Sequence, residues 1–182
     1  SVAEHWVSVS GVARPVAVGG RPAVQLDLTL TRESVRAVYH VQAYPGTSIL
    51  RQWIELENTG TAPCTLPAPA AFLLCMKEEE PASLTHYWMY GGTSRPNQGV
   101  LDKADVHPNY HHALLGEKSD NYVPWLALQR KNAPADGMFA ALDYLGKWTL
   151  GVDSLADSTR VSALIPSLAQ YSLAAGENLV LP

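Results

Sequence analysis

The sequence predicts an all-β fold in which two antiparallel sheets stack face to face as a β-sandwich. Three observations carry this prediction: short runs alternate apolar and polar residues with a period of two, helical periodicity is nearly absent, and turn-forming residues separate the runs. Such alternation buries one face of each strand and leaves the other in water, as antiparallel sheets require. About ten strands at this spacing indicate one stacked pair of sheets.

Three runs in the first third of the chain show the alternation most clearly. In residues 22–30 and again in 35–42, apolar side chains occupy every second position. Residues 48–57 place Leu50, Ile54 and Leu56 on one face and Arg51, Trp53, Glu55 and Glu57 on the other. Further strands are predicted at residues 84–90, 122–130, 138–145, 147–152, 160–165 and 178–181.

Glycine-containing turns connect these runs. Pro45-Gly46 suits a type II turn, since glycine accepts a positive φ at the second central position. Leu145-Gly146-Lys147-Trp148 has glycine first in a two-residue loop, which predicts a type II′ hairpin. Residues 167–175 fit either a helical turn or irregular strand, and residues 91–121 read as one long irregular segment. A loop of that length in a compact domain is normally functional.

Length and composition exclude several classes of protein. The chain has 182 residues, of which 47% are hydrophobic and 16% charged, so we expect a single domain, 1–182, with a full core. A complete (β/α)8 barrel usually needs about 250 residues. A net charge of −4 provides no basic surface for nucleic acid. No run approaches the ~20 apolar residues that span a membrane, no signal peptide is visible, and nothing marks a compartment. Because the chain begins with Ser1 and not Met, we expect it to be excised from something longer.

The cysteines, histidines and carboxylates form no motif for catalysis or metal binding. Cys64 and Cys75 do not make a disulfide framework, and we expect two free, buried thiols over a disulfide. No nucleophile or phosphate-binding motif is present. His107, His111 and His112 cluster near Asp105, but no second cluster completes a metal site, so surface or hydrogen-bonded histidines are favoured and no metal or cofactor is predicted. The run Glu78-Glu79-Glu80 is typical of a solvated face.

The aromatic residues provide candidates for ligand contact. The strand at 84–90 carries Trp88 and Tyr90 on one face and leads into the long irregular segment, where the polar residues Arg95 and Asn97 follow. Flat aromatic rings bind the C–H face of sugars, so these four residues are candidates for carbohydrate contact. The competing interpretation is that Trp88 fills the sandwich core. Trp53 alternates with charged residues, and an exposed Trp there predicts cover by another domain or subunit.

Several segments together resemble one known family. These are RQWIELENTGTAP (51–63), which contains an E-N-x-G run, the aromatic strand and loop HYWMYGGTSRPNQGVL (86–101), VPWLALQR (123–130), ALDYLGKWTLGVD (141–153) and SLAAGENLVLP (172–182). In this order and spacing they resemble the N-terminal β-sandwich, or supersandwich, of the melibiase-type α-galactosidases of glycoside hydrolase family thirty-six, a galactose mutarotase-like fold. The sequence departs from the family at Val123, Trp125 and Ala175, where the family has Asn, Phe and Pro.

The resemblance implies a supporting role. In this family the catalytic barrel, with its two catalytic aspartates, begins just after the segment that resembles 172–182, so no catalytic residue is carried over. The implied partners are that barrel in the same chain, its carbohydrate substrate and further subunits of a homo-oligomer. Trp88, Tyr90, Arg95 and Asn97 would lie near the sugar-facing rim. Trp53, His111 and His112 would meet another domain or subunit.

Two alternatives stay open at the sequence level. One is a stand-alone carbohydrate-binding module with a Trp platform. The other is an aldose 1-epimerase-like enzyme that uses His and Glu as acid and base, with His86, His107, His111 or His112 supplying the acid.

Overall fold

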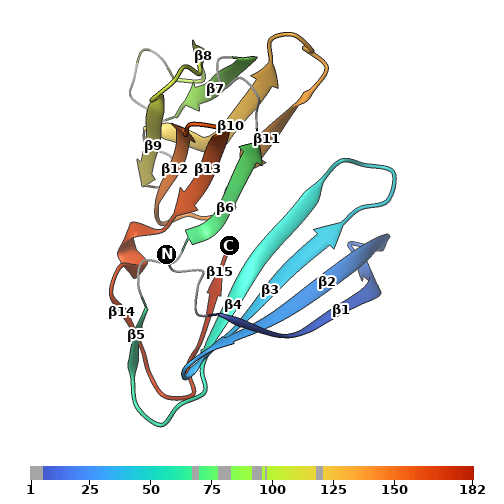
Figure 1. Cartoon of the computed structure of the whole chain (residues 1–182), viewed down its shortest axis with the longest axis vertical. Coiled ribbons are helices and arrows are strands. Elements are labelled where there is room, and N and C mark those ends of the chain that lie inside the picture. Colours follow the sequence, from blue (N-terminus) through green and yellow to red (C-terminus); the bar gives the residue numbers. More distant parts are fainter. Residues whose placement is uncertain (1–5, 67–69, 78–82, 92–95, 97, 118–120) are drawn as a thin grey trace. The chain divides into compact units, whose positions relative to one another are not determined.

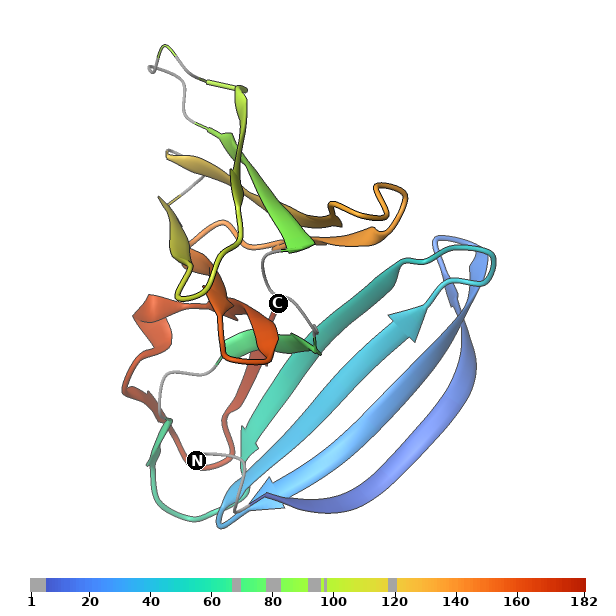
Figure 2. The ribbon, with the colours of Figure 1, turned by 45° about the horizontal axis from the view of Figure 1, so that its top comes forward.

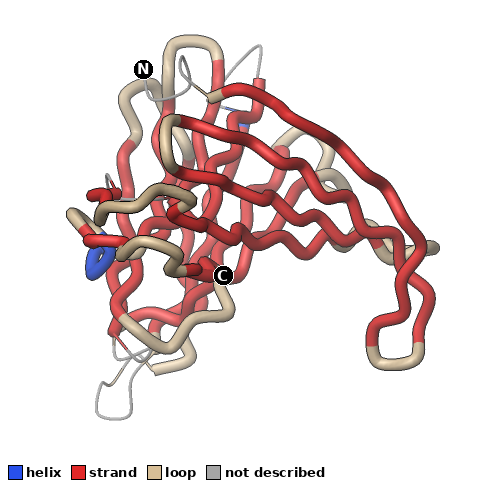
Figure 3. Tube along the Cα trace, turned by 90° about the horizontal axis from the view of Figure 1, so that it is seen from below, coloured by secondary structure: helices blue, strands red, loops and turns tan. Residues whose placement is uncertain are grey.

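The computed structural model describes residues 6–66, 70–77, 83–91, 96, 98–117 and 121–182. These residues form antiparallel strands almost throughout, as Figure 3 shows, so the predicted all-β antiparallel class is confirmed. The chain divides into two compact units, one made of Ser1–Pro67 with Gln170–Pro182 and the other of Ala68–Ala169. Each unit is described by itself. In the described residues, no helix has the length and apolar character needed to cross a membrane.

The first unit is built on a five-stranded sheet whose long strands lie side by side (Figures 1 and 2). A short two-stranded ribbon pairs β5 (Cys64–Leu66) with β14 (Tyr171–Leu173). The strands of the larger sheet, in spatial order, are β1 (Val7–Val18), β2 (Arg21–Arg32), β3 (Val35–Ala43), β4 (Leu50–Asn58) and β15 (Asn178–Leu181).

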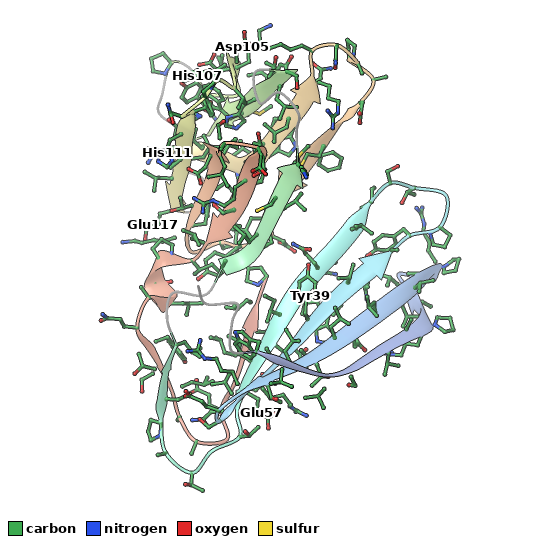
Figure 4. The ribbon with its side chains drawn as sticks, viewed as in Figure 1. Tyr39, Glu57, Asp105, His107, His111 and Glu117 are labelled. Carbon is green, nitrogen blue, oxygen red and sulfur yellow. The ribbon has the colours of Figure 1, made fainter. Side chains whose placement is uncertain are left out.

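The two faces of this sheet separate as the alternation predicts. The register pairs Leu28 with Tyr39 and Tyr39 with Ile54, so these side chains share an apolar face. Asp27, His40 and Trp53 are paired in the same way on the opposite, polar face. Figure 4 labels one residue of each face, Tyr39 on the apolar face and Glu57 on the polar one.

The predicted turn at Pro45-Gly46 is confirmed. Gly46 has a φ of 77°, and the Thr47 N–H donates to the Tyr44 carbonyl at 3.1 Å, which closes a four-residue turn. Only glycine adopts this backbone conformation without strain.

Asn58 explains physically why an E-N-x-G run ends β4. Its side chain is fully buried, and its amide nitrogen donates to the carbonyls of Ala62 at 2.8 Å and Leu173 at 3.0 Å. Its side-chain oxygen accepts the Gly60 N–H at 2.9 Å. One side chain thus holds the end of β4, the turn after it and the end of β14 together.

Removal of this side chain is expected to destabilise the first unit. Asn58→Ala leaves the carbonyls of Ala62 and Leu173 and the Gly60 N–H without their side-chain partner, and we expect a loss of about 2 kcal/mol in the free energy of unfolding. Chemical denaturation followed by circular dichroism measures it. The matched control is Asn178→Ala on the exposed side of β15, which should change stability by less than about 0.5 kcal/mol. Equal effects of the two variants would contradict this role.

The second unit contains two four-stranded antiparallel sheets. One orders its strands β11-β10-β7-β8 and the other β6-β13-β12-β9. Aromatic contacts between β7 and β9, described below, join the two sheets face to face. The strands are β6 (Ala70–Lys77), β7 (Leu84–Tyr90), β8 (Leu101–Asp105), β9 (His111–Glu117), β10 (Tyr122–Arg130), β11 (Gly137–Ala141), β12 (Lys147–Ser154) and β13 (Ser158–Leu164).

The core of this unit is filled by inward-facing residues of both sheets. Trp148 is its largest fully buried side chain, and the indole lies directly over Gly116 on the neighbouring strand β9. The other fully buried apolar side chains include Leu84, Leu114, Leu126, Leu128, Leu150, Val152 and Val161.

Three sequence-based predictions are corrected here. Residues 91–121 are not one irregular segment, because β8 and β9 lie within them. The predicted hairpin at Gly146 is wrong: β11 pairs with β10 while β12 pairs with β9 and β13, so the chain passes from one sheet to the other. Both cysteines are free thiols as expected, but they are not buried, since Cys75 is exposed and Cys64 half-buried. Between 167 and 175 both alternatives occur, a 3-10 helix at Pro166–Leu168 and the short strand β14.

Candidate functional site

The candidate sugar-contact region centres on the end of β7. Tyr90 is half-buried, and its ring stacks on Tyr122 of β10 with ring centroids 5.2 Å apart. Its hydroxyl donates to the Asp102 carboxylate on β8 at 3.3 Å. Backbone hydrogen bonds with Gly99 and Val100 anchor the same residue to the returning chain. The group presents two aromatic rings beside a carboxylate, a combination suited to a polyhydroxylated ligand.

Trp88 lies deeper, between the two sheets. Only 7% of its surface is exposed, and its ring contacts His112 of β9 at 4.3 Å and His86 of its own strand at 5.1 Å between centroids. A ring buried in this way is not accessible to a sugar. The core interpretation of Trp88 therefore fits its position.

The two histidines beside Trp88 lie in an environment that disfavours charge. Burial, reinforced by the neighbouring His112, lowers the pKa of His86 to about 3. Burial also lowers the pKa of His112, although the Asp102 charge opposes the shift. The Nδ1 atom of His86 lies 2.9 Å from the Tyr110 hydroxyl, and burial raises the pKa of Tyr110 to about 12. All three groups are thus neutral at pH 7.

His111 lies on the opposite side of β9 from His112. Figure 4 shows it at one end of that strand, with Glu117 at the other. Its Nδ1 is hydrogen-bonded to Asp153 of β12, which also accepts two hydrogen bonds from Arg160 of β13 at 3.0 and 2.8 Å. Burial opposes ionisation of Asp153, but the bonds from His111 and Arg160 outweigh it and lower its pKa. A row of hydrogen-bonded polar side chains therefore crosses the three strands β9, β12 and β13.

Trp53 lies on the polar face of the first unit, on β4. Its ring stacks on His40 of β3 with centroids 4.6 Å apart and an interplanar angle of 14°. The Arg51 guanidinium lies 5.7 Å from the same indole centroid. With His40 and Arg51 so close to the ring, Trp53 is half-buried and is a poor platform for a sugar.

A hydrogen-bonded network continues from His40 across the polar face. The Asp27 carboxylate lies 2.6 Å from His40 Nδ1 and accepts from Gln25 at 2.7 Å and Arg14 at 3.2 Å. Gln42 in turn donates to Gln25 at 2.8 Å. Burial opposes ionisation of Asp27, but these hydrogen bonds outweigh it and lower its pKa. The network satisfies polar side chains that are largely buried, since Gln25, His40 and Gln42 are each at most 8% exposed.

The sequence-predicted site residues thus lie in separate places. Trp88 and His112 come together in the core of the second unit, Tyr90 at the end of β7, His111 on an outward sheet face, and Trp53 in the first unit. Arg95 and Asn97, like Glu78-Glu79-Glu80, lie outside the described residues.

Sequence reasoning did not find two members of the Tyr90 group. Tyr122 directly precedes the strand motif VPWLALQR, but only the pairing of β10 with β7 brings it opposite Tyr90. Asp102 was one of several carboxylates in a segment read as irregular. Its role depends on β8, which alternation did not reveal.

Within the described ranges, no three His, Cys, Asp or Glu side chains lie close enough to share a metal ion. Of the candidate acids for an epimerase, His86 is fully buried and His112 half-buried among aromatic rings. His107 and His111 are exposed, with Nδ1 contacts to the Pro108 carbonyl and to Asp153.

Comparison with known proteins finds similar folds among solved structures. The sequence matches no protein-family model and no curated protein sequence. Among solved structures, the chain is similar to the galactosidase domain of the α-galactosidase–sucrose kinase AgaSK, with 20% identity and a TM-score of 0.79 over 97% of this chain and 27% of that one.

Other α-galactosidases resemble the chain to the same degree. A variant of the GH36 α-galactosidase AgaA from Geobacillus stearothermophilus, in complex with stachyose, gives 16% identity and a TM-score of 0.81 over 97% of this chain and 27% of that one. The α-galactosidase from Lactobacillus brevis gives 13% identity and a TM-score of 0.78 over 98% and 25%. The chain spans about a quarter of the length of these proteins. The resemblance expected from the sequence is thus confirmed at the level of fold: this chain has the fold that GH36 α-galactosidases use for about a quarter of their length.

Proposed function

We propose that this chain is the non-catalytic, N-terminal β-sandwich domain of an α-galactosidase-like glycoside hydrolase. The observation that carries the proposal is the coverage: nearly the whole chain matches these enzymes, while only about a quarter of each enzyme is matched. The motif order from 51 to 182 supports the same assignment. The catalytic barrel of the same chain is then the principal partner.

The substrate proposed for the parent enzyme is a sugar with a terminal α-linked galactose. AgaA variants were solved with stachyose and with raffinose, and we extend that substrate class to the parent of this chain. The proposed reaction is retaining hydrolysis by two carboxylates of the barrel, one acting as nucleophile and the other as acid and base.

Within this proposal, different residues of the domain have different supporting roles. Tyr90, with its stacked partner Tyr122 and with Asp102, forms the part of the active-site rim that this domain supplies. Arg95 and Asn97 are proposed to extend that rim. The outward face that carries His111 is proposed as a surface for another domain or subunit, and the polar face around Trp53 as a second one. Trp88 and His112 are not part of the rim in this proposal; they pack together in the core and hold the end of β7 in position.

The activity of the 182-residue chain by itself tests the non-catalytic role. We expect no hydrolysis of an aryl α-galactoside above the buffer rate, because in this proposal the two carboxylates that retaining hydrolysis requires belong to the barrel. Measurable hydrolysis that survives rigorous purification would contradict the assignment. Independently, the reading frame after Pro182 should encode a barrel with aspartates at strand ends. A frame that encodes an unrelated domain would overturn the proposed parent.

The Tyr90–Tyr122 pair also favours a second candidate, a carbohydrate-binding module. Its half-exposed rings and the adjacent carboxylate form a small platform independent of any barrel. Calorimetry of the chain with raffinose distinguishes the two: a module binds at millimolar sugar or below and loses binding in Tyr90→Ala, while a purely supporting domain shows no heat. Tyr144→Ala, a half-buried tyrosine outside this group, is the control.

A further inference from the structure

Three neighbouring rings in the core of the second unit each carry a buried nitrogen without a partner. These nitrogens are Nε2 of His86, Nε1 of Trp88 and Nδ1 of His112, and none has a hydrogen-bond partner among the described residues. The three rings form a closed triangle, with centroids 5.1 Å apart for His86–Trp88, 5.3 Å for His86–His112 and 4.3 Å for Trp88–His112. They come from both sheets, since β7 carries two of the residues and β9 the third.

Apolar residues from the other inward-facing strands surround this triangle. Leu126 and Leu128 of β10 and Leu150 and Val152 of β12 are fully buried in the same unit and offer no side-chain hydrogen bond. The polar or charged groups that act on the triangle are Tyr110, which contacts His86 Nδ1, and Asp102 and His111, whose charges act on His112. An unpaired buried nitrogen costs free energy comparable to a lost hydrogen bond, so three in one place call for a shared partner.

We propose that His86 Nε2, Trp88 Nε1 and His112 Nδ1 together bind one internal water molecule. With one water, each of the three nitrogens has one hydrogen-bond partner. The indole N–H of Trp88 is only a donor, so it donates to the water oxygen, and the water donates its two hydrogens to the two imidazole nitrogens. Buried waters in proteins typically make about three hydrogen bonds of this kind to otherwise unsatisfied groups.

The water assigns a tautomer to each histidine. His86 must carry its proton on Nδ1 and donate it to the Tyr110 oxygen, because Nε2 accepts from the water. His112 must carry its proton on Nε2, because its Nδ1 accepts from the water. The water thereby joins β7 to β9 and specifies how the two sheets stack, which an all-apolar layer does less sharply.

Nuclear magnetic resonance of the ¹⁵N-labelled 182-residue chain tests the site. We expect a cross-peak between the Trp88 indole proton and a water molecule that stays bound for longer than nanoseconds. We also expect ¹⁵N shifts of an Nδ1–H tautomer for His86 and an Nε2–H tautomer for His112. The indole proton of Trp125 serves as the internal control and should show only rapidly exchanging water.

Two outcomes would overturn the proposal. A Trp88 indole proton without a water cross-peak shows that no long-lived water accepts from the indole. An Nε2–H tautomer of His86 leaves the water without one of its acceptors. Trp88→Phe, which removes the donor but keeps a ring, should abolish the water signal and leave the His86–Tyr110 hydrogen bond in place. If Trp88→Phe fails to fold, the tautomer measurement on the unaltered chain still decides.

Discussion

Acidification from pH 6.5 to pH 4.5 is expected to lower the free energy of unfolding by about 2–3 kcal/mol through His86 alone. His86 is fully buried, and burial together with the neighbouring His112 lowers its pKa from 6.5 to about 3. The unfolded chain therefore takes up a proton on this residue near pH 6.5, while the folded chain does so only near pH 3. Stability from the neutral, buried imidazole is present above pH 6.5 and is lost as the pH falls through this window.

The range from pH 6.5 to pH 4.5 separates the effect of histidine protonation on stability from that of carboxylate protonation. Asp27 and Asp153 also have lowered pKa values, but their contribution is lost only as the pH falls below the ordinary aspartate value of 3.8. Denaturant titrations at pH 6.5, 5.5 and 4.5 therefore report mainly on histidines. His112, whose pKa is lowered too, adds to the effect in the same direction.

The control for this experiment is His107→Gln, which alters an exposed histidine and should leave the pH slope intact. Tyr110→Phe removes the hydrogen bond to His86 but keeps the buried imidazole, so this variant should be less stable at every pH with most of the slope retained. A ring-proton titration of His86 with a midpoint near pH 6.5 in the folded chain would refute the explanation, whatever the variants do.

Gly116→Ala is expected to lower the free energy of unfolding by about 3 kcal/mol, at the upper end of what overpacking costs. A Cβ atom at this position would lie 2.2 Å from Cζ2 and 2.4 Å from Cε2 of Trp148, far inside van der Waals contact. Trp148 is 1% exposed, so its indole is packed against other core residues. Chemical denaturation monitored by circular dichroism measures the loss.

A glycine on the adjacent strand provides the matched control. A Cβ atom at Gly151 would meet only the Ser162 hydroxyl at 3.0 Å, so Gly151→Ala should cost about 1 kcal/mol or less. In the background Trp148→Leu, Gly116→Ala should cost much less than in the original chain, because the clashing ring is gone. Additive effects of Gly116→Ala and Trp148→Leu would show that the indole is not the cause.

Much of the fold was predictable because alternation is a local signal. Residues 22–30 and 35–42 lie in strands, as does the run 48–57 from Leu50 onward, and the two faces of that strand are those that the pattern indicates. The unpredicted strands are those whose local signal is weak. β1 contains Pro15, which an edge strand tolerates, and β6 is a continuous apolar run without alternation.

The candidate site was less predictable, because a side chain's role depends on the element that faces it. Trp88 and Tyr90 share one face in the sequence pattern, yet Trp88 lies between the sheets while Tyr90 stacks on Tyr122 at the strand end. A register irregularity between β10 and β7 lies between their partners, Tyr122 and Leu126. Period-two alternation contains no information on such an irregularity.

The sequence by itself determined the all-β class, most of the strands and the resemblance to the α-galactosidase β-sandwich, because these depend on local periodicity and on the order of short motifs. The tertiary structure alone decided which strands pair across the long connections and which residues lose contact with water. It placed His86, Trp88 and His112 in one triangle although the outer two are 26 positions apart, and the burial created there turns ordinary imidazoles into neutral core residues. Sheet stacking joins residues distant in the chain, and burial is a property of the stacked pair, not of either strand.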